Sequence, residues 1–244
     1  TFSIIIFALA PTYANATVIN AKTASSSADF QVEQIIHAVK IHDYGLVTIN
    51  DTLKLSAEDG SRVLQNFSMG FPFEYGANLD YCFAYDASNP DERFEVERDV
   101  GLGGLIGFYG LNVVFPEPGV NISAGESYNF TVVFVFSNLV SSENEAYFNF
   151  TFPMYPSLVQ TASLCNVTVI LPPDAKCTIN PFEERELNFS TATIDDSQVL
   201  KHAAFNVTSF QDEPALLKFS THAYMFPLIN VNEVKREIEL DQWG

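Results

Sequence analysis

The chain has 244 residues, with 30 Asp or Glu against 12 Lys or Arg, giving a formal net charge of −18 and a sequence pI near 4.3. This balance argues against nucleic acid as a partner, because phosphate binding needs Lys and Arg, and against electrostatic docking on anionic lipid. The 22 Phe and 10 Tyr residues favour β-strands, since broad rings pack well on a pleated, half-buried surface.

The first residues have the pattern of a secretory signal. Ser3–Ala10 is an apolar run too short to span a bilayer, and small residues precede a cleavage point after Ala14. We expect residues 1–14 to be a signal-peptide remnant, with an N-terminal strand as the alternative, and residues 15–30 to be an extended lead-in. Residues 31–244 then form a lumenal β-sandwich region. No other apolar stretch is long enough to span a membrane, so we expect any anchor to lie outside this sequence.

Strand patterns follow in chain order. The segment 32–40 fits a strand or a short helix, and the segment 41–55 alternates as a strand before a turn at Gly60. The segment 78–86 places Leu79, Tyr81, Phe83 and Tyr85 on one face. A charged strand at 93–98 has the composition of a sheet edge. The glycine-rich stretch 100–110 is predicted to be a turn followed by an apolar strand, because it lacks the helix that a phosphate-binding loop needs.

The strongest strand runs from Tyr128 to Phe136, after turns at Pro118-Gly119 and Gly125. Its residues Tyr128, Phe130, Val132, Phe134 and Phe136 share one face, which we expect to be buried, and Asn129 should face outward. Further short strands are predicted at 146–152, 164–171, 177–179, 186–189, 203–208, 215–226 and 234–240. Short strands punctuated by Pro, Gly and Asn predict an all-β fold, an antiparallel β-sandwich with one large or two closely packed sub-domains that divide near residues 153–161.

Nine Asn-X-Ser/Thr acceptors support a secreted or lumenal glycoprotein. In most of them the middle residue is apolar, so at period two the Asn and the Ser or Thr share the solvent face of a sheet. Asn15 lies close to the expected cleavage point. The predicted acceptors are Asn50, Asn66, Asn121, Asn129, Asn149, Asn166, Asn188 and Asn206.

Three cysteines allow at most one disulfide bond within the chain. Cys165 and Cys177 flank a strand and a Pro-Pro-Asp turn, so a bridge between them is expected if that turn closes a hairpin. The cysteine spacing does not suggest a zinc site.

The sequence contains no catalytic, cofactor-binding or metal-binding pattern that we recognise. The four histidines, at 37, 42, 202 and 222, lack partners at a ligand spacing and are expected to be structural. The acidic groups lie in predicted turns or edges, where they are usually solvated. No Gly-X-Ser-X-Gly elbow and no His-Glu-X-X-His helix occurs. We therefore expect no cofactor.

The C-terminal half carries short motifs in a recognisable order. They are Tyr147-Phe-Asn-Phe, Tyr155-Pro, Gln160-Thr161, the strand ending at Leu171-Pro-Pro, Phe205 to Phe210, Arg236-Glu-Ile-Glu239 and Trp243-Gly244, with a Pro118-Gly119 turn upstream. This order resembles the N-terminal lumenal domain of ribophorin I, a subunit of oligosaccharyltransferase, over residues 18–244. Gln242 stands where that family has His before Trp-Gly, and Asn180-Pro181-Phe182 is an incomplete form of its Gly-Pro-Phe.

The resemblance implies a non-catalytic scaffold subunit in protein N-glycosylation, not an enzyme, held on the lumenal side of the endoplasmic reticulum membrane by a segment beyond this sequence. Its implied partners are other oligosaccharyltransferase subunits and nascent secretory polypeptides. Two other hypotheses stay open: a secreted or cell-surface glycosylated β-sandwich with a structural or adhesion role, and a secreted hydrolase whose site lies in a missing part.

Overall fold

The computed structural model describes residues 30–57, 61–221, 226 and 228. The predicted signal remnant, Asn15, nearly all of the lead-in, the turn at Gly60, the strand at 234–240 and the Trp243-Gly244 match lie outside these residues. Within them the chain is an all-β sandwich, as its alternating pattern predicts.

The larger layer is a sheet of eleven strands, and almost every neighbouring pair in it is antiparallel. The exception is the pair of β1 and β13, which is parallel. In spatial order the strands are β12 (Ser157–Leu158), β4 (Asn66–Pro72), β7 (Leu105–Val114), β6 (Asn89–Leu102), β5 (Leu79–Asp86), β9 (Ser127–Phe136), β2 (Val47–Ala57), β1 (Phe30–Ile41), β13 (Ala162–Pro173), β16 (Ser197–Val207) and β15 (Phe189–Ile194).

The smaller layer has four strands, and a separate short pair lies beside the larger sheet. The four are β10 (Val140–Ser142), β11 (Tyr147–Pro153), β17 (Pro214–Ser220) and β14 (Lys176–Ile179), and the pair is β3 (Arg62–Leu64) with β8 (Val120–Ile122). The helical segments are η2 (Asp43–Gly45), η3 (Phe73–Asn78) and α1 (Pro181–Glu184). Asn180 caps α1 by accepting a hydrogen bond from the Phe182 N–H at 3.0 Å.

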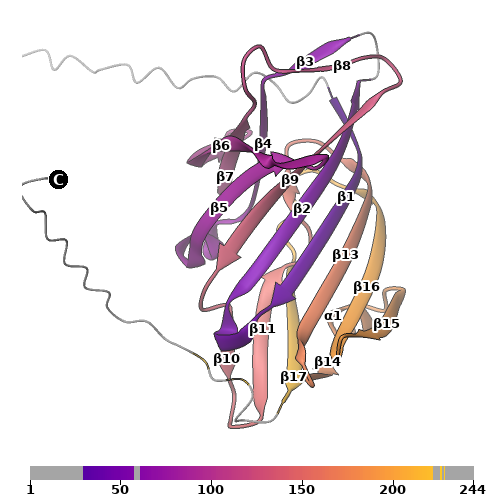
Figure 1. The fold of residues 1–244 in the computed structure, drawn as a ribbon. Coiled ribbons are helices and arrows are strands. Elements are labelled where there is room, and N and C mark those ends of the chain that lie inside the picture. The colour runs from indigo at the N-terminus through magenta and orange to yellow at the C-terminus, as the bar shows by residue number, and fades with distance from the viewer. Residues whose placement is uncertain (1–29, 58–60, 222–225, 227, 229–244) are drawn as a thin grey trace, which may run out of the picture.

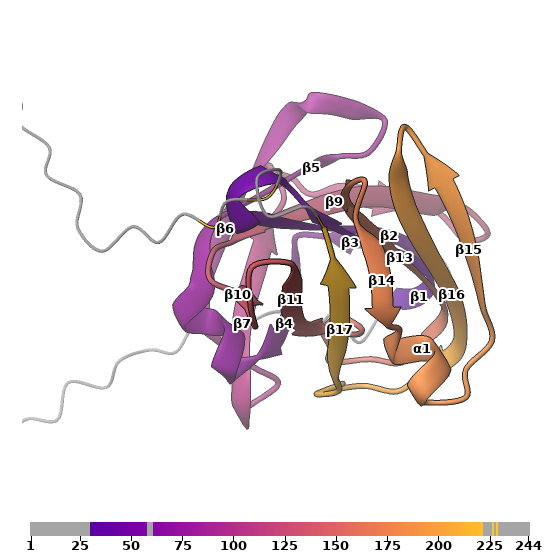
Figure 2. The same cartoon turned by 90° about the horizontal axis from the view of Figure 1, so that it is seen from below.

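The eleven-stranded sheet curves around the four-stranded one. Figure 1 shows its long central strands side by side, with β10, β11, β17 and β14 packed against their lower part. In the view from below, the large sheet passes from β4 and β7 on one side to β15 and β16 on the other (Figure 2). Its inner face is therefore covered, and its outer face is left to solvent.

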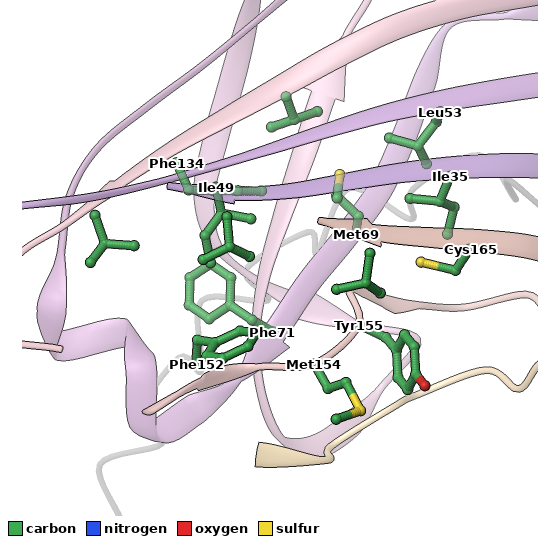
Figure 3. Packing of buried hydrophobic residues seen from close by; sticks show 14 of the residues in the cluster. Ile35, Ile49, Leu53, Met69, Phe71, Phe134, Phe152, Met154, Tyr155 and Cys165 are labelled. Atoms are coloured by element: carbon green, nitrogen blue, oxygen red, sulfur yellow. The ribbon is translucent and has the colours of Figure 1, made fainter. Parts of the chain in front are cut away.

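The inner face carries the aromatic core. On strand β9, Phe130, Val132, Phe134 and Phe136 are buried and Asn129 is exposed, as predicted, whereas Tyr128, also predicted to be buried, is half-buried at the start of the strand. Phe71 of β4 packs edge-on against Phe134 and Phe136, with ring centroids 5.6 and 5.2 Å away. Figure 3 shows side chains of both layers meeting here, including Phe152 from β11 beside Phe71.

Three local predictions need correction. The predicted strand 41–55 is interrupted by η2, where Tyr44 has a φ of 65°, whereas the segment 32–40, for which the sequence leaves strand and helix both open, is a strand. The charged strand 93–98 belongs to β6, which lies between β7 and β5 and is not an edge, because Phe94 and Val96 alternate with the charged residues and pack inward. The segment 186–189 precedes β15 and contributes only its last residue to it.

The glycine-rich stretch 100–110 is a turn followed by a strand, as predicted. Gly103 and Gly104 join β6 to β7 with φ values of 57° and 76°. A Cβ on Gly103 would lie 2.7 Å from the Phe210 ring, so both the backbone conformation and the space require glycine there.

The segment 153–161 connects the two layers. Residues 153–158 are all buried, and one continuous hydrophobic cluster includes residues from both sides of this segment. A division into sub-domains at this point would expose that shared core to water.

A buried polar bridge joins the layers at the same place. His37 of β1 and Asp51 of β2 are 1% and 2% exposed, and His37 Nδ1 lies 2.6 Å from Asp51 Oδ1. The other ring nitrogen, Nε2, lies 3.1 Å from the carbonyl oxygen of Pro153, at the end of β11. Because a carbonyl only accepts, Nε2 carries a proton and donates it, and a second proton lies between Nδ1 and the carboxyl group. The pair thus fixes the large sheet to the small one.

Replacing His37 with Leu should destabilise the fold by about 3–5 kcal/mol, because Asp51 would remain buried without its partner. The double variant His37→Leu/Asp51→Leu should recover a large part of that loss. Urea unfolding followed by circular dichroism measures both. Equal stabilities of wild type and His37→Leu would show that the bridge contributes nothing to the fold.

Candidate functional site

A row of aromatic side chains lies on the outer face of β5. Tyr81, Phe83 and Tyr85 alternate with the buried Cys82 and Ala84, and Tyr81 is 54% exposed. Successive ring centroids are 5.7 and 6.1 Å apart. On the next strand, Val135 and Val133 pair with Tyr81 and Phe83; Val135 is half-buried and Val133 is buried beneath the neighbouring side chains. Rings of this size usually lie in a core, so a row of them on a solvent face indicates a binding surface.

Two arginines lie over this row. The Arg93 guanidinium of β6 is 4.1 Å from the Phe83 centroid and 5.4 Å from that of Tyr85, and Arg98 is 5.8 Å from that of Tyr81. Among the described residues neither arginine forms an ion pair. The rings attract the guanidinium groups by cation–π interaction and hold them in place. We call Tyr81, Phe83, Tyr85, Arg93 and Arg98 the aromatic–arginine surface.

The rim of this surface is acidic. Asp91, Glu92, Glu95 and Asp99 are exposed on or beside β6, and none of them is ion-paired within the described part of the chain. Glu97 accepts a hydrogen bond of 2.8 Å from the Asn112 amide, which orders the surface toward β7. The site thus combines an apolar, cationic centre with an anionic edge.

One end of the row is anchored by Asp86. Its Oδ2 accepts from the Tyr128 hydroxyl at 2.6 Å, and its Oδ1 accepts from the N–H groups of Ser88 and Asn89 at 2.7 and 3.1 Å. Burial raises the pKa of the Asp86 carboxyl, but the hydrogen bonds from Ser88, Tyr128 and Asn89 outweigh this and lower it below the ordinary value. Burial and the Asp86 hydrogen bond raise the pKa of Tyr128. The turn after Tyr85 is therefore held firmly.

The sequence predicts that Leu79, Tyr81, Phe83 and Tyr85 share one face. The structure confirms this for the three aromatic residues, but Leu79 packs against the core, since a register shift separates it from Tyr81. The sequence alone does not identify Arg93 and Arg98 as part of the site, because their segment has the composition of a charged edge strand. The sequence does contain a pattern that could have indicated the arginines: an Arg on the strand that follows an aromatic strand after a short turn, where cross-strand pairing brings the two side chains together.

The eight predicted glycan acceptors of the described residues all reach the surface in part. Asn121, Asn129, Asn188 and Asn206 are exposed, while Asn50, Asn66, Asn149 and Asn166 are half-buried within strands. Their use as acceptors stays a prediction.

The Cys165–Cys177 bridge does not form in this structure, where Cys82, Cys165 and Cys177 are free. The hairpin it requires is absent, because β13 pairs with β1 and β16 while β14 pairs with β17 in the other sheet. Burial raises the pKa of the Cys177 thiol to about 11.

The described histidines make local contacts. His202 Nδ1 donates a hydrogen bond of 2.7 Å to the Asn188 carbonyl oxygen, and its ring stacks on Phe182. His42 Nε2 lies 2.9 Å from the Thr48 hydroxyl oxygen. His222 lies outside the described residues. Within them, no cluster of three or more His, Cys, Asp or Glu side chains is arranged to hold a metal ion.

The buried pair of His37 and Asp51 lies near Cys165, which raises the question of a nucleophile. Burial, followed by the Asp51 charge, raises the pKa of the Cys165 thiol, and the side chain is fully buried. A reactive cysteine needs the opposite, a lowered pKa and access to substrate. This group is therefore structural.

No helix of the described residues has both the length and the apolar character needed to cross a bilayer.

No protein-family model matches this sequence, and no curated protein matches it. Among solved structures, an M1 zinc metallopeptidase from Deinococcus radiodurans matches with a TM-score of 0.44 and 12% identity over 78% of this chain and 42% of that one. An aminopeptidase N family protein from Idiomarina loihiensis matches with 0.43 and 11% over 75% and 29%. Yeast LTA4 hydrolase matches with 0.39 and 10% over 80% and 29%.

These matches contradict the ribophorin prediction, since the structures are of M1 peptidases and none of those named is a ribophorin. The predicted scaffold role in oligosaccharyltransferase is therefore wrong. The prediction that the chain is not an enzyme is contradicted too, because the matching proteins are enzymes. This chain spans less than half the length of each of them, and at this similarity no activity passes to it.

Replacing Asp86 with Asn should lower stability at pH 7 by about 1–2 kcal/mol, because the hydrogen bonds to the charged carboxylate are lost. The folded pKa is depressed, so the stabilisation is present above the ordinary carboxyl pKa of about 4 and is lost as the pH falls through the folded value. The difference between wild type and variant should therefore shrink in acid. Thermal unfolding at pH 7 and pH 3 measures it, and a pH-independent difference would contradict this origin.

Replacing Asn129 with Gln should remove one glycan without changing the melting temperature, because the Asn129 side chain is exposed on the outer face. Intact-mass measurement before and after peptide N-glycosidase, on protein secreted from eukaryotic cells, checks the glycan. An unchanged mass would mean that this acceptor is a by-product of strand composition.

Proposed function

We propose that this chain is a protein-binding domain that contacts a partner through the aromatic–arginine surface. The observation that carries the proposal is the Arg93 guanidinium, which lies 4.1 Å from the centroid of the half-buried Phe83 ring and forms no ion pair among the described residues. Tyr and Arg are enriched at the energetic centres of protein interfaces, where they combine a large contact area with hydrogen bonding. Charged and polar groups form the rim of such interfaces, as the acidic residues do here.

The partner's chemistry follows from the charges. Its contact surface should be apolar at the centre, to cover Tyr81 and Phe83, and neutral or basic at its edge, to face Asp91, Glu92, Glu95 and Asp99. A second copy of this chain is disfavoured, because it would bring the same acidic rim and a net charge of −18 against itself.

We also propose that the protein passes through a compartment where N-glycosylation occurs. Four acceptors with exposed asparagines support this, together with the signal-like sequence at residues 1–14. A partner would then be a protein of the same compartment or of the extracellular space.

Site-specific photocrosslinking tests the binding surface in the protein's own host. Benzoylphenylalanine placed at Tyr81 should give one discrete protein adduct, and the additional change Phe83→Glu should reduce its yield at least tenfold. Tyr147 of β11 is the matched control, because it is a tyrosine of similar exposure, 45% against 54%, outside the proposed surface. Circular dichroism confirms that Phe83→Glu folds.

Adducts of equal yield at Tyr81 and Tyr147, or an adduct that Phe83→Glu leaves unchanged, would overturn the proposal. A glycan adduct in place of a protein adduct would overturn it as well.

A further inference from the structure

The eleven-stranded sheet ends at β15, and this edge is open within the described part of the chain. Strand β15 pairs with β16 over all six residues from Phe189 to Ile194 and has no described strand on its other side. All six side chains are exposed. The opposite end of the sheet is different, because the two-residue strand β12 covers β4 there.

This edge lacks the features that usually block pairing with another chain. The strand Phe-Ser-Thr-Ala-Thr-Ile contains no charge, no proline and no register shift against β16. Exposed edges of this kind present unpaired N–H and C=O groups and accept an added strand. Its length of six residues corresponds to about 20 Å of extended chain.

Acidic residues stand at both ends of the strand. Glu183, Glu184 and Glu186 precede it, and Asp195 and Asp196 form the turn that follows it. All five are exposed, and none of them is ion-paired among the described residues. A strand added to β15 would therefore have carboxylates facing both of its ends.

A cavity of about 440 Å³ lies beside the edge, over β13, β16 and β15. Phe189 and Phe205 contribute its apolar wall, and Phe205 is 74% exposed. Asn166 and Lys201 add polar groups to the lining. An apolar side chain of an added strand can lean over β15 into this space, which gives a position of sequence preference.

We propose that β15 binds an extended peptide segment of another protein, with Lys or Arg at both ends and an apolar side chain between them. Backbone hydrogen bonds to β15 supply affinity, the flanking carboxylates select basic ends, and the cavity takes the apolar side chain. A second copy of this chain does not fit, because pairing β15 with its own symmetry mate would place the Glu186 end against Asp195 and Asp196. This site is separate from the aromatic–arginine surface and does not depend on it.

A defined peptide tests the proposal. The probe is a fluorescein-labelled octapeptide, Lys-Arg-Thr-Phe-Thr-Val-Lys-Arg, and its matched control has Glu-Glu at both ends. Fluorescence anisotropy uses the full chain with Asn166→Gln and Asn188→Gln, so that no glycan stands in the cavity or at the start of β15. We expect the basic probe to bind at least tenfold more tightly than the acidic one, and more weakly as salt rises.

Two proline variants locate the contact. Thr191 and Ala192 are adjacent, so one N–H faces β16 and the other faces outward. The two single variants, Thr191→Pro and Ala192→Pro, are made separately and their melting temperatures are compared. The one that keeps the wild-type melting temperature has lost only the outward-facing N–H, and it should bind the probe at least tenfold more weakly. Phe205→Ser should weaken binding of the probe but not of an analogue with Ala in place of its Phe.

Charge variants remain informative if both proline variants unfold. Glu186→Gln/Asp195→Gly/Asp196→Asn, which removes these charges without creating an N-glycan acceptor before Ser197, should reduce the tenfold preference for the basic probe to less than threefold. Equal binding of the basic and acidic probes, no binding of either, or unchanged binding by the charge variant would overturn the proposal. Dimerisation of the chain through β15, seen by sedimentation and lost in the folded proline variant, would overturn it too.

Discussion

The fold depends on how the concave face of the eleven-stranded sheet is filled. Eleven strands that curve this strongly leave a wide apolar surface, and the four-stranded sheet covers it. At the meeting point, His37 spans from Asp51 of the large sheet to the Pro153 carbonyl of the small one. In a core made almost wholly of Phe, Leu, Ile and Val, such a bridge fixes how the layers align, because any other alignment would leave buried polar groups unpaired.

Closing the concave face determines where function can lie. With the inner side chains committed to the core, the outer face and the open edge carry the groups that another molecule can reach. On the outer face, Tyr81 is exposed to solvent and Phe83 is half-buried, and Arg98 and Arg93 cover part of these rings and lower the cost of their exposure. At the edge, β15 is held by β16 alone, and its turn through Asp195 and Asp196 has φ values of 48° and 62° that match the twist of a tight hairpin.

Much of the strand content could be predicted from the sequence, because alternation is a local property. The face of β9 that contains Phe130 and Phe134 is clear in the sequence and buried in the structure. Strand order is not local. The charged residues of β6 suggest an edge, yet β6 lies inside the sheet because its alternate residues face the core. The bridge expected between Cys165 and Cys177 required a hairpin, whereas the chain passes into a different sheet after Pro173.

The aromatic–arginine surface was only half predictable. The shared face of Tyr81, Phe83 and Tyr85 follows from period two, but the direction of that face depends on the curvature of the whole sheet. The arginines enter the site through pairing of β5 with β6, in which Arg93 lies opposite Tyr85. The family resemblance rested on short motifs, several of them beyond the described residues, and short motifs in strands recur because strand composition is restricted.

Hydroxyl-radical footprinting of the full chain, with and without its crosslinked partner, tests the central claim that the inner face is closed and the outer face of β5 is the binding surface. We expect Tyr81 to be oxidised readily in the free protein, and Phe134 and Phe136 on the neighbouring strand to be protected. The partner should suppress oxidation of Tyr81 and leave that of Tyr147 unchanged. Oxidation of Phe134 at the rate of Tyr81, or oxidation of Tyr81 that the partner leaves unaltered, would contradict it.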